Sequence, residues 1–545
     1  MCGIAGVFGN HAENYDVNNM LLSISHRGES SYQAEVKYAD GFKFGTNRLG
    51  IVDENTGQQP FVSPDGKVYC ILNGEIYNHK ELREILRQHY SFKGCCDSEV
   101  ILVGYLHMGE KIFELIQGMY CIALHDSRQK TWYLARDHLG IKPLYYALDA
   151  DHYLFSSELK SFYGLNVDII NDFPCGAVMK NGVLITPGKK YRFNEINGEI
   201  GSDVDVINTG LDKLSKAVSK MLPEKGERAA CMLSGGVDSS SILTLMRHLH
   251  QGPLVAYTFY NKEASLSNDY NAAKIICDHL NVPLNVVTPE VGQLTDFYRK
   301  NGVWMTETYE PALVRNAVSY YFLSQKISED GFKFVLSGEG ADEVLGGYDY
   351  FRLLPESQID HAIGLSLNQL NHTYLKMADR ASMFATLEVR VPYLDEDWID
   401  FNINLPSSFR IRGGENKWLL RNMMSQMMPD VITKRAKLGM NEGAGFGSND
   451  PGKSIYYKAI CEYYDSSPGK IEADLKLFAA YKNDYQINES NPEEVFNFCR
   501  YIEHGFIRLA GSEHRPQLNT NQLTDKNHQS TAHQAVYPHN GTANI

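Results

Sequence analysis

The sequence has no apolar run that approaches the roughly 18 residues a helix needs to cross a bilayer. It begins with no cationic segment followed by an apolar stretch, so we expect neither a membrane partner nor a secretory signal. Its ten cysteines include no CxxC pair, which predicts a reduced, cytoplasmic protein rather than a disulfide scaffold. Metal binding by the adjacent Cys95 and Cys96 is a minor alternative to ordinary packing.

Basic residues are also scarce, since 52 lysines and arginines face 66 aspartates and glutamates and give a formal net charge of −14. No basic cluster offsets this charge locally, which argues against nucleic acid as a partner and favours small metabolites. A chain of 545 residues with 43% hydrophobic and 22% charged residues is typical of globular proteins with two or more domains.

The first part of the chain, residues 1–193, consists mainly of short β-rich runs punctuated by glycine, such as 68–72 and 131–135. One clear helical pattern interrupts it early, at 80–89. This pattern predicts an α+β domain of stacked antiparallel sheets flanked by helices.

The second part, residues 206–510, alternates apolar strands with helices, which predicts an α/β domain with a parallel sheet. The polar, glycine-containing segment 194–205 is expected to be a linker, and the polar segment 511–545 a disordered tail. The strands are expected at 229–233, 254–259 and 334–336, with helices starting at Ser239 and Asn271.

The most informative residue follows the initiator methionine. Removal of Met1 would leave Cys2 with a thiol and a free α-amine on the same residue. The reference pKa values of an α-amine, about 7.7–8.0, and of a cysteine thiol, about 8.5, allow the amine to accept the thiol proton near neutral pH. The thiolate can then attack an amide carbonyl. The alternative is a buried strand in which Cys2 has no chemical role.

Residues 234–240, SGGVDSS, follow an apolar strand and open a helix. Backbone N–H groups gather at such a helix N-terminus and bind anionic oxygen atoms such as those of phosphate. The motif lacks the Gly-Lys-Ser/Thr ending of a Walker loop, but Asp238 is suited to holding Mg²⁺ against phosphates. A turn that only caps the helix is the alternative.

A second loop, SGEGADE at 337–343, also follows an apolar strand and places three carboxylates within five residues. They would repel one another on an ordinary surface turn, whereas a divalent cation or a site that needs a base would favour them. Asp342 is the better metal candidate and Glu339 the better general base. A solvated acidic loop is the alternative.

Together these motifs resemble those of the glutamine-dependent asparagine synthetases. The resemblance runs from Cys2 to about Leu509, with the motifs in the family's order: MCGIAG, NRLGIVD, NGEIYNH, SGGVDSS, SGEGADE and EVRVPYLD. It implies an N-terminal-nucleophile (Ntn) hydrolase domain followed by an ATP-pyrophosphatase-type domain. It also implies a homodimer that uses glutamine, ATP, Mg²⁺ and aspartate.

In the first domain, the resemblance assigns Cys2 as the nucleophile of glutamine hydrolysis, with the amide of Asn73 and the N–H of Gly74 as the oxyanion hole. Arg48 would hold the α-carboxylate of glutamine, and Asp97 its α-amine. The glutamine-binding residues expected in this way are Arg48, Leu49, Gly50, Ile51, Val52, Asn73, Gly74, Glu75 and Asp97.

In the second domain, the resemblance implies that an acceptor carboxylate attacks the α-phosphorus of ATP to give an acyl-adenylate and pyrophosphate, and that ammonia then displaces AMP. Glu339 would act near the adenylate, while Asp238 and Asp342 would hold Mg²⁺. The ATP-binding residues expected in this way are Leu233, Ser234, Gly235, Gly236, Asp238, Ser239, Ser240, Asn261, Ser337, Gly338 and Lys437.

Three segments depart from the family pattern. The usual HRGPD is HRGES at 26–30, LGMNEG at 438–443 replaces a Phe-Ser-Asp-Gly run, and Asn261 stands where an aliphatic residue is usual. Two of these lie near the expected nucleotide and acceptor, so the alternative to aspartate is another carboxylate in specialised or cell-surface metabolism. A non-catalytic relative that binds glutamine and nucleotide is a third hypothesis, against which the intact catalytic motifs argue.

Overall fold

The computed structural model describes residues 2–29, 35–39, 41–53, 56–88, 90–165, 167, 169–193, 201–261, 268–308, 311–439 and 443–444. Contacts along its backbone divide the chain into two compact units. The first unit contains residues 1–190 and a distant segment, Ser382–Glu388, and the second contains Tyr191–Ala381 and the chain from Val389 onward. The predicted tail 511–545 lies outside the described residues, as do 440–442.

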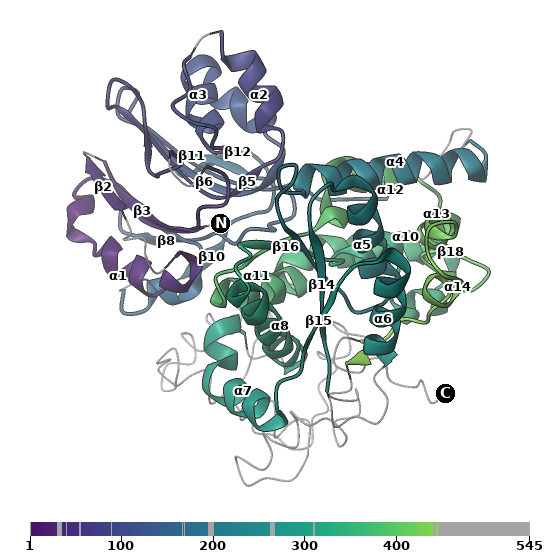
Figure 1. Ribbon diagram of the computed structural model, residues 1–545. Coiled ribbons are helices and arrows are strands. Elements are labelled where there is room, and N and C mark those ends of the chain that lie inside the picture. The colour runs from purple at the N-terminus through teal and green to yellow at the C-terminus, as the bar shows by residue number, and fades with distance from the viewer. Residues whose placement is uncertain are drawn as a thin grey trace. The chain divides into compact units, whose positions relative to one another are not determined.

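Two six-stranded sheets form the first unit (Figure 1). Their strand orders are β10-β8-β9-β1-β3-β2 and β12-β11-β7-β6-β5-β4, and the described pairings in both are antiparallel. The strands are β1 (Cys2–Phe8), β2 (Glu35–Ala39), β3 (Phe42–Arg48), β4 (Phe61–Val62), β5 (Val68–Ile76), β6 (Gly118–Asp126), β7 (Thr131–Arg136), β8 (Tyr145–Asp149), β9 (His152–Ser156), β10 (Ile170–Asp172), β11 (Val178–Lys180) and β12 (Val183–Thr186).

The two sheets stack face to face, and helices flank the stack (Figure 1). Apolar side chains from both sheets fill the space between them, among them Ile4, Phe44 and Phe155 from one sheet and Ile71 and Ala123 from the other. The expected α+β architecture of stacked antiparallel sheets with helices is therefore confirmed. The helices and 3-10 turns of this unit are α1 (Val17–Leu22), α2 (His79–Leu86), α3 (Glu99–Met108), η1 (Ala12–Asn14), η2 (Ser25–Arg27), η3 (Gly109–Glu114) and η4 (Leu159–Phe162).

Helix α3 shows why the prediction of a single early helix is wrong. The amphipathic pattern at 80–89 corresponds to α2, but α3 has no such pattern because its residues Glu99 to Tyr105 are all buried. A helix that is apolar on nearly every side cannot be recognised by a stripe of apolar residues with a period of about 3.6.

A five-stranded sheet of order β15-β14-β13-β16-β17 forms the centre of the second unit. β13 pairs in parallel with β14 and β16, and β14 with β15. Helices α5 and α6 lie on one side of this sheet and α8 on the other (Figure 1). The expected α/β architecture with a parallel sheet is confirmed. The bounds are β13 (Ala229–Met232), β14 (Leu254–Phe259), β15 (Leu284–Val287), β16 (Phe334–Leu336), β17 (Glu388–Arg390), α5 (Val237–Leu249), α6 (Asn268–Leu280) and α8 (Pro311–Glu329).

Helix α4 (Asp203–Met221) begins inside the segment predicted as a linker, 194–205. Ser202 and Asp205 form a capping box, in which the Ser202 hydroxyl accepts from the Asp205 N–H and the Asp205 carboxylate accepts from the Ser202 N–H. The last three residues of the predicted linker are therefore helical, and 194–200 lie outside the described residues. The other elements are α7 (Val291–Thr306), α9 (Ala341–Leu345), α10 (Glu356–Asn368), α11 (Tyr374–Phe384), α12 (Glu396–Ile403), α13 (Trp418–Met424), α14 (Asp430–Thr433), β18 (Ile411–Arg412), β19 (Glu415–Asn416), η5 (Asp349–Leu353), η6 (Leu370–His372), η7 (Pro392–Leu394) and η8 (Ser407–Phe409).

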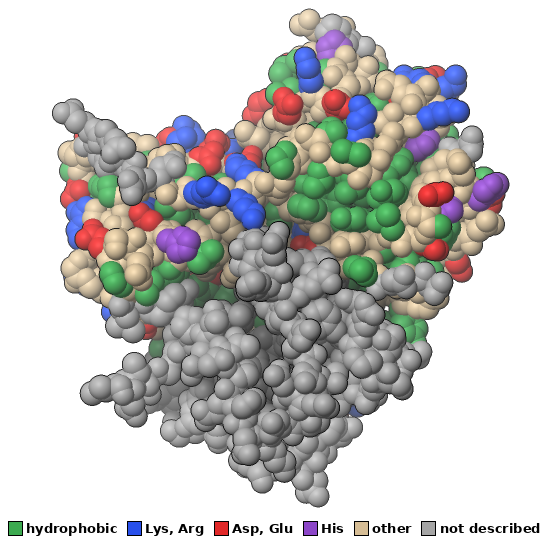
Figure 2. Space-filling model, turned by 180° about the vertical axis from the view of Figure 1, so that it is seen from behind, with side chains coloured by type: hydrophobic (Ala, Val, Ile, Leu, Met, Phe, Trp, Pro, Cys, Tyr) green, Lys and Arg blue, Asp and Glu red, His purple; other side chains and the backbone are tan. Residues whose placement is uncertain are grey.

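The surface carries charges of both signs. On the face shown in Figure 2, acidic and basic side chains are interspersed over the described residues, and apolar side chains gather in a patch among them. None of the helices that the structure describes is both long and apolar enough to cross a membrane.

Candidate functional site

Cys2 lies at the start of β1, and the stacking of the sheets brings it to Asn73 on β5. The Cys2 nitrogen donates a hydrogen bond of 3.2 Å to Oδ1 of Asn73. The amide nitrogen of Asn73 in turn donates to Oγ of Ser157 at 3.5 Å. Cys2 is only 4% exposed and Asn73 is fully buried. The structure thus brings together the predicted nucleophile and a predicted oxyanion-hole residue from strands of different sheets.

Gly74, the other predicted oxyanion-hole residue, occupies a position that only glycine fits. Its φ is +143°, and a Cβ atom there would lie 1.9 Å from the carbonyl oxygen of Met119 on β6. Any larger residue would have to push β5 away from β6. The close approach of β5 and β6 beside Asn73 therefore depends on this glycine.

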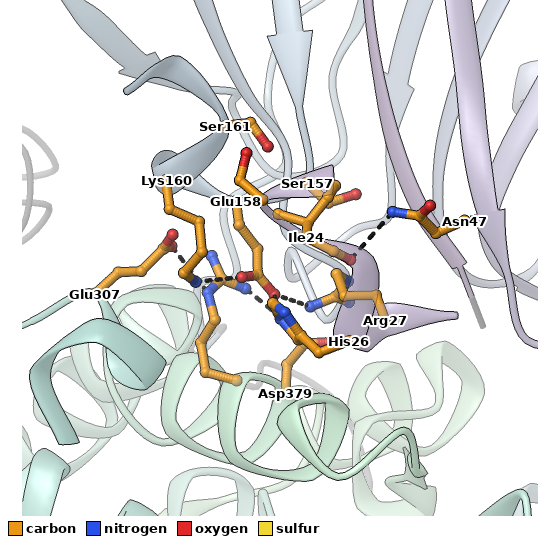
Figure 3. Close-up of polar contacts among 12 residues, drawn as sticks. Ile24, His26, Arg27, Asn47, Ser157, Glu158, Lys160, Ser161, Glu307 and Asp379 are labelled. Carbon is orange, nitrogen blue, oxygen red and sulfur yellow. Dashed lines mark hydrogen bonds and ion pairs between the residues drawn. The ribbon is translucent and has the colours of Figure 1, made fainter. Parts of the chain in front are cut away.

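Figure 3 shows a buried cluster of charged side chains that includes Arg27, Glu158 and Lys160. Nε of Arg27 donates to the Cys2 carbonyl oxygen at 3.2 Å, and its Nη1 donates to Glu158 at 2.6 Å. Lys160 also donates to Glu158, and all three side chains are fully buried. Burial lowers the pKa of His26, although Glu158, 3.1 Å from its ring nitrogen, acts in the opposite direction. Since an unpaired buried charge is costly, this cluster keeps Cys2 in place.

The segment Ser382–Glu388 completes the surroundings of this cluster within the first unit. Oγ1 of Thr386 donates to the carbonyl oxygen of His26 at 2.9 Å, and the Phe384 ring lies 5.1 Å from the imidazole. Met383 packs on Leu49, one of the predicted glutamine-binding residues. No local sequence pattern relates this segment to residues so far away in the chain.

The charged residues predicted to bind glutamine are all buried in the first unit. Arg48 ends β3, and its Nη2 donates to the Asp53 carbonyl oxygen at 2.8 Å. Asp97 accepts from the Ile76 N–H at 2.7 Å, which ties it to the end of β5. Together with the buried Glu75 they offer opposite charges of the kind that a zwitterionic amino acid needs. Leu49 and Gly50 are buried, and Ile51 and Val52 are half-buried.

In the second unit, β13 and β16 are neighbours although they are not consecutive among the strands of the sheet. The strand order reverses between them, and ligands of open parallel sheets bind at the carboxyl ends of strands beside such a reversal. The two loops that follow these strands are 234–240 and 337–343, the two motifs found in the sequence. A Cβ atom at Gly338 would lie 2.8 Å from the Ser239 nitrogen, so the loops are in direct contact.

The first of these loops is held by its own serines. The Ser234 N–H donates to Oγ of Ser239 at 3.1 Å, and the Gly236 N–H to Oγ of Ser234 at 3.3 Å. Gly235 has a φ of +73°, and a Cβ atom there would lie 2.4 Å from the backbone nitrogen of Ala273. The remaining predicted ATP residues in this unit are mostly buried and flank the same strand ends: Leu233, Ser240, Asn261 and Ser337.

The two predicted metal ligands are joined by a lysine that sequence reasoning missed. Nζ of Lys417 lies 2.6 Å from Oδ2 of Asp238 and 2.5 Å from Oδ1 of Asp342. Nζ of Lys437, a predicted phosphate ligand, lies 2.5 Å from Oδ2 of Asp342. Burial by itself raises the pKa of Asp342, but Lys417 and Lys437 outweigh it and hold this pKa well below its usual range.

The position of Lys417 offers a signal that could have revealed it. Lys417 immediately precedes α13 and has a φ of +57°. A cation at the N-terminus of a helix is opposed by the helix dipole, and this side chain is only 2% exposed. A buried lysine in such a place must be compensated by carboxylates, as Asp238 and Asp342 do here.

The other carboxyl groups of the second loop have raised pKa values. Loss of water around the carboxyl group raises the pKa of Glu339 to about 7, with Lys437 acting against this and Asp342 adding to it. Burial raises the pKa of Glu343 to about 8, and the Tyr348 hydroxyl donates to this group. A carboxyl group with a pKa near 7 is suited to proton transfer at neutral pH, which suits the general-base role predicted for Glu339.

The residues present fit a magnesium ion. Oδ1 of Asp238 is buried and accepts no hydrogen bond from the described residues. Carboxylate oxygens are the hard ligands that Mg²⁺ prefers, and Mg²⁺ commonly uses one or two of them together with phosphate oxygens. In the described parts of the chain no three His, Cys, Asp or Glu side chains form a metal cluster. Asp238 and Asp342 would therefore hold the ion only together with another ligand such as a nucleotide.

Comparisons with known proteins match both units. The family model of the glutamine amidotransferase domain matches residues 1–198, and that of asparagine synthase matches 210–362 and 354–451. An asparagine synthetase B [glutamine-hydrolyzing] from Escherichia coli (strain K12) is 28% identical, over 85% of this chain and 86% of the relative. The nodule asparagine synthetase [glutamine-hydrolyzing] of Pisum sativum is 30% identical, over 93% of this chain and 86% of the relative.

Among solved structures, the glutamine phosphoribosylpyrophosphate amidotransferase from B. subtilis is 14% identical and covers 52% of this chain and 90% of its own. Its TM-score of 0.30 is too low to support a conclusion. The relatives and both family models instead agree with the motifs in the two units. The chain belongs to the glutamine-hydrolysing asparagine synthetase family.

Proposed function

We propose that the protein makes asparagine from aspartate, glutamine and ATP through a β-aspartyl-AMP intermediate. The observation that carries the proposal is the bridge of Lys417 between Asp238 and Asp342, at the strand ends where both ATP-site motifs meet. The Cys2 contact with Asn73 supports a separate glutaminase centre in the other unit. The relatives named asparagine synthetase span most of this chain, which supports the same overall reaction.

At the first centre, the α-amine of Cys2 accepts the thiol proton, and the sulfur attacks the side-chain carbonyl carbon of glutamine. The oxyanion that forms is stabilised by the Asn73 amide and the Gly74 N–H. The carbon–nitrogen bond then breaks, the amine returns the proton, and ammonia leaves. Water cleaves the resulting thioester to glutamate and restores the thiol. Arg48 and Asp97 hold the two charged groups of the glutamine backbone.

At the second centre, the aspartate side-chain carboxylate attacks the α-phosphorus of ATP, and pyrophosphate leaves. Lys437, Ser234 and the N-terminus of α5 contact the phosphates in this proposal. Asp238 and Asp342 would hold Mg²⁺, which supplies positive charge against the departing pyrophosphate. Ammonia then attacks the acyl carbon, AMP leaves, and Glu339 accepts the proton that the new amide nitrogen loses.

Further parts of the proposal concern the whole chain. We place the glutaminase domain at 1–193 and the synthetase domain at 206–510, and we propose a homodimeric, cytoplasmic enzyme with no nucleic-acid or membrane partner. Light scattering coupled to gel filtration tests the dimer directly.

The acceptor is tested by pyrophosphate exchange. With labelled pyrophosphate, we expect aspartate to drive exchange into ATP at least about tenfold faster than glutamate or other dicarboxylates, because the acceptor must fit before it is activated. Mass spectrometry of the amidated product is the second readout. If none of the carboxylates in a broad panel supports exchange, the proposed adenylation step is contradicted.

One observation favours the second candidate, amidation of a different carboxylate. The backbone N–H of Asn261 donates to the carbonyl oxygen of Ala444 at 3.0 Å. Ala444 directly follows Gly443, the last residue of the departing segment 438–443, so Asn261 lies next to the end of that segment. If both segments differ from the family pattern at one place, they can together alter which acceptor fits. Pyrophosphate exchange driven by a carboxylate other than aspartate would establish this candidate.

Glu29, which stands where the family usually has proline, is expected to support glutamine binding. Its carboxylate accepts from the Gly50 N–H at 3.1 Å, and its own N–H donates to the Arg48 carbonyl oxygen at 2.9 Å. Glu29→Ala should raise the KM for glutamine about three- to tenfold, since it removes the bond to Gly50 and a typical intramolecular hydrogen bond contributes about 0.5–1.5 kcal/mol. Ammonium-dependent synthesis should not change. The exposed Glu84→Ala is the matched control, and an unaltered KM in Glu29→Ala would reject this role.

A further inference from the structure

The side chain of Gln59 lies between Cys2 and the backbone of β5. Nε2 of Gln59 is 3.8 Å from Sγ of Cys2. The same nitrogen donates to the Leu72 carbonyl oxygen at 3.2 Å, and Oε1 of Gln59 accepts from the Leu72 N–H at 2.6 Å. Gln59 and Cys2 are each 4% exposed. The catalytic motifs discussed above do not include this residue.

The two bonds to Leu72 settle which end of the amide faces the sulfur. If the amide were turned over, its oxygen would face the Leu72 carbonyl oxygen and its nitrogen would face the Leu72 N–H, so both contacts would be repulsive. Only the present orientation satisfies both groups. The NH₂ end, with its two hydrogens, can then donate one to Leu72 and direct the other at Cys2.

The backbone around Gln59 keeps this amide in place. Two residues further on, Phe61 pairs with Cys70 in the β4–β5 ladder, so the Gln59 side chain continues the pairing of β5 up to Leu72. Leu72 immediately precedes Asn73, whose side chain contacts the Cys2 nitrogen. The donor to the sulfur and the oxyanion-hole residue are thus held by adjacent positions of one strand.

We propose that the Gln59 amide is a hydrogen-bond donor to the Cys2 sulfur and stabilises its negative charge each time the thiolate forms. This inference rests on the glutaminase chemistry proposed above for Cys2. The sulfur carries negative charge twice in each cycle, before it attacks glutamine and when it leaves the thioester. A donor that is fixed in advance needs no reorganisation at either point. Hydrogen bonds to ionised acceptors are about twice as strong as those between neutral groups, so the contact favours the charged sulfur over the neutral one.

The first variant is Gln59→Glu, which keeps the shape of the side chain and an acceptor for the Leu72 N–H but removes the donor and adds a negative charge. We expect the rate at which a chloroketone analogue of glutamine alkylates Cys2 at pH 7 to fall at least about tenfold, equivalent to about 1.4 kcal/mol. The pH profile of the alkylation should move to higher pH by about one unit. With glutamine as substrate, kcat should fall more than the KM rises, because Gln59 contacts the sulfur.

A second variant, Gln59→Met, separates the loss of the donor from the added charge. It should also slow alkylation and move the profile to higher pH, by less than Gln59→Glu. The exposed Gln129→Glu introduces the same charge in the same unit and should match the unmodified chain. Ammonium-dependent synthesis should be normal in all three variants. This activity serves as the control that the variants are folded.

The outcomes distinguish this inference from the proposal on which it rests. If the unmodified chain is not alkylated at Cys2 at all, the proposed glutaminase function fails. If the unmodified chain reacts and Gln59→Met reacts at the same rate with the same pH profile, the Gln59 donor is not needed and the inference is overturned, whatever Gln59→Glu does. A fall in rate with an unshifted profile would also overturn it, since lost packing slows the reaction without affecting the charge on sulfur.

Discussion

Cys2→Ala should abolish asparagine formation from glutamine while asparagine formation from ammonium ions continues at its normal rate. The variant has no atom that can attack the glutamine carbonyl, so we expect glutamine-dependent turnover to fall by about 10³-fold or more. The carboxylates and lysines of the proposed ATP site belong to the other unit and keep their contacts. Product analysis with each nitrogen source, at saturating aspartate and ATP, measures both activities in one preparation.

The matched control for this prediction is Cys95→Ala. Cys95 is exposed, whereas Cys2 is buried, and Cys95 donates its backbone N–H to Asp53, a bond that alanine retains. This control should leave both activities unchanged. Equal losses with glutamine and ammonium in Cys2→Ala would contradict two independent centres.

Elements that depend on short apolar runs could be predicted from the sequence. The strands expected at 254–259 and 334–336 have these bounds in the structure, and the strand expected at 229–233 ends one residue earlier. Each run is bounded by glycine, proline or polar residues and is buried on both faces of a parallel sheet, which is the clearest strand signal a sequence contains. The loops after these strands each carry a long, specific motif, and the ATP-binding role predicted for them stays a prediction.

Contacts that depend on how the sheets stack could not be predicted. Gln59 and Arg27 contact Cys2, and Ser157 contacts the Ile4 N–H and the Asn73 amide, only because β1 packs over β5. None of the three has a neighbour in sequence that reveals this. The same holds for Thr386, which reaches the carbonyl oxygen of His26 from 360 residues away.

Lys417 is an intermediate case, because the sequence contains a signal for it. The acidic loop predicts a divalent cation or a base, whereas in the structure two ammonium groups compensate Asp342. A lysine that directly precedes an apolar helix is electrostatically misplaced, and such a residue is worth testing as the partner of an acidic loop.

Asp342→Asn should eliminate the ATP chemistry and leave glutamine hydrolysis intact. Asparagine keeps the shape of the side chain but cannot neutralise Lys417 and Lys437, and its amide is a weaker ligand for Mg²⁺ than a carboxylate. We expect aspartate-dependent exchange of pyrophosphate into ATP to fall by about 10²–10³-fold, the usual effect of removing one charged group from a preorganised site. Glutamate release from glutamine, measured without ATP, should be unchanged.

The control for this variant is Asp349→Asn, since Asp349 is 52% exposed and, in the described part of the chain, forms its ion pair with Arg352. Asp349→Asn should exchange pyrophosphate normally. Normal exchange in Asp342→Asn would remove this carboxylate from the mechanism. Thermal unfolding of each variant shows whether a loss of activity reflects a loss of fold.

A magnesium titration separates the two roles that Asp342 can have. If Asp342 binds the metal, Asp342→Asn and Asp238→Asn should both need much more Mg²⁺ to reach half of their remaining exchange rate. Binding of Mn²⁺ in the presence of ATP, measured by electron paramagnetic resonance, should also weaken in both variants. If Asp342 only holds the two lysines, its variant loses exchange at an unchanged Mg²⁺ requirement. Because Lys417 contacts both carboxylates, the two variants should also be non-additive, with the double variant little worse than either single one.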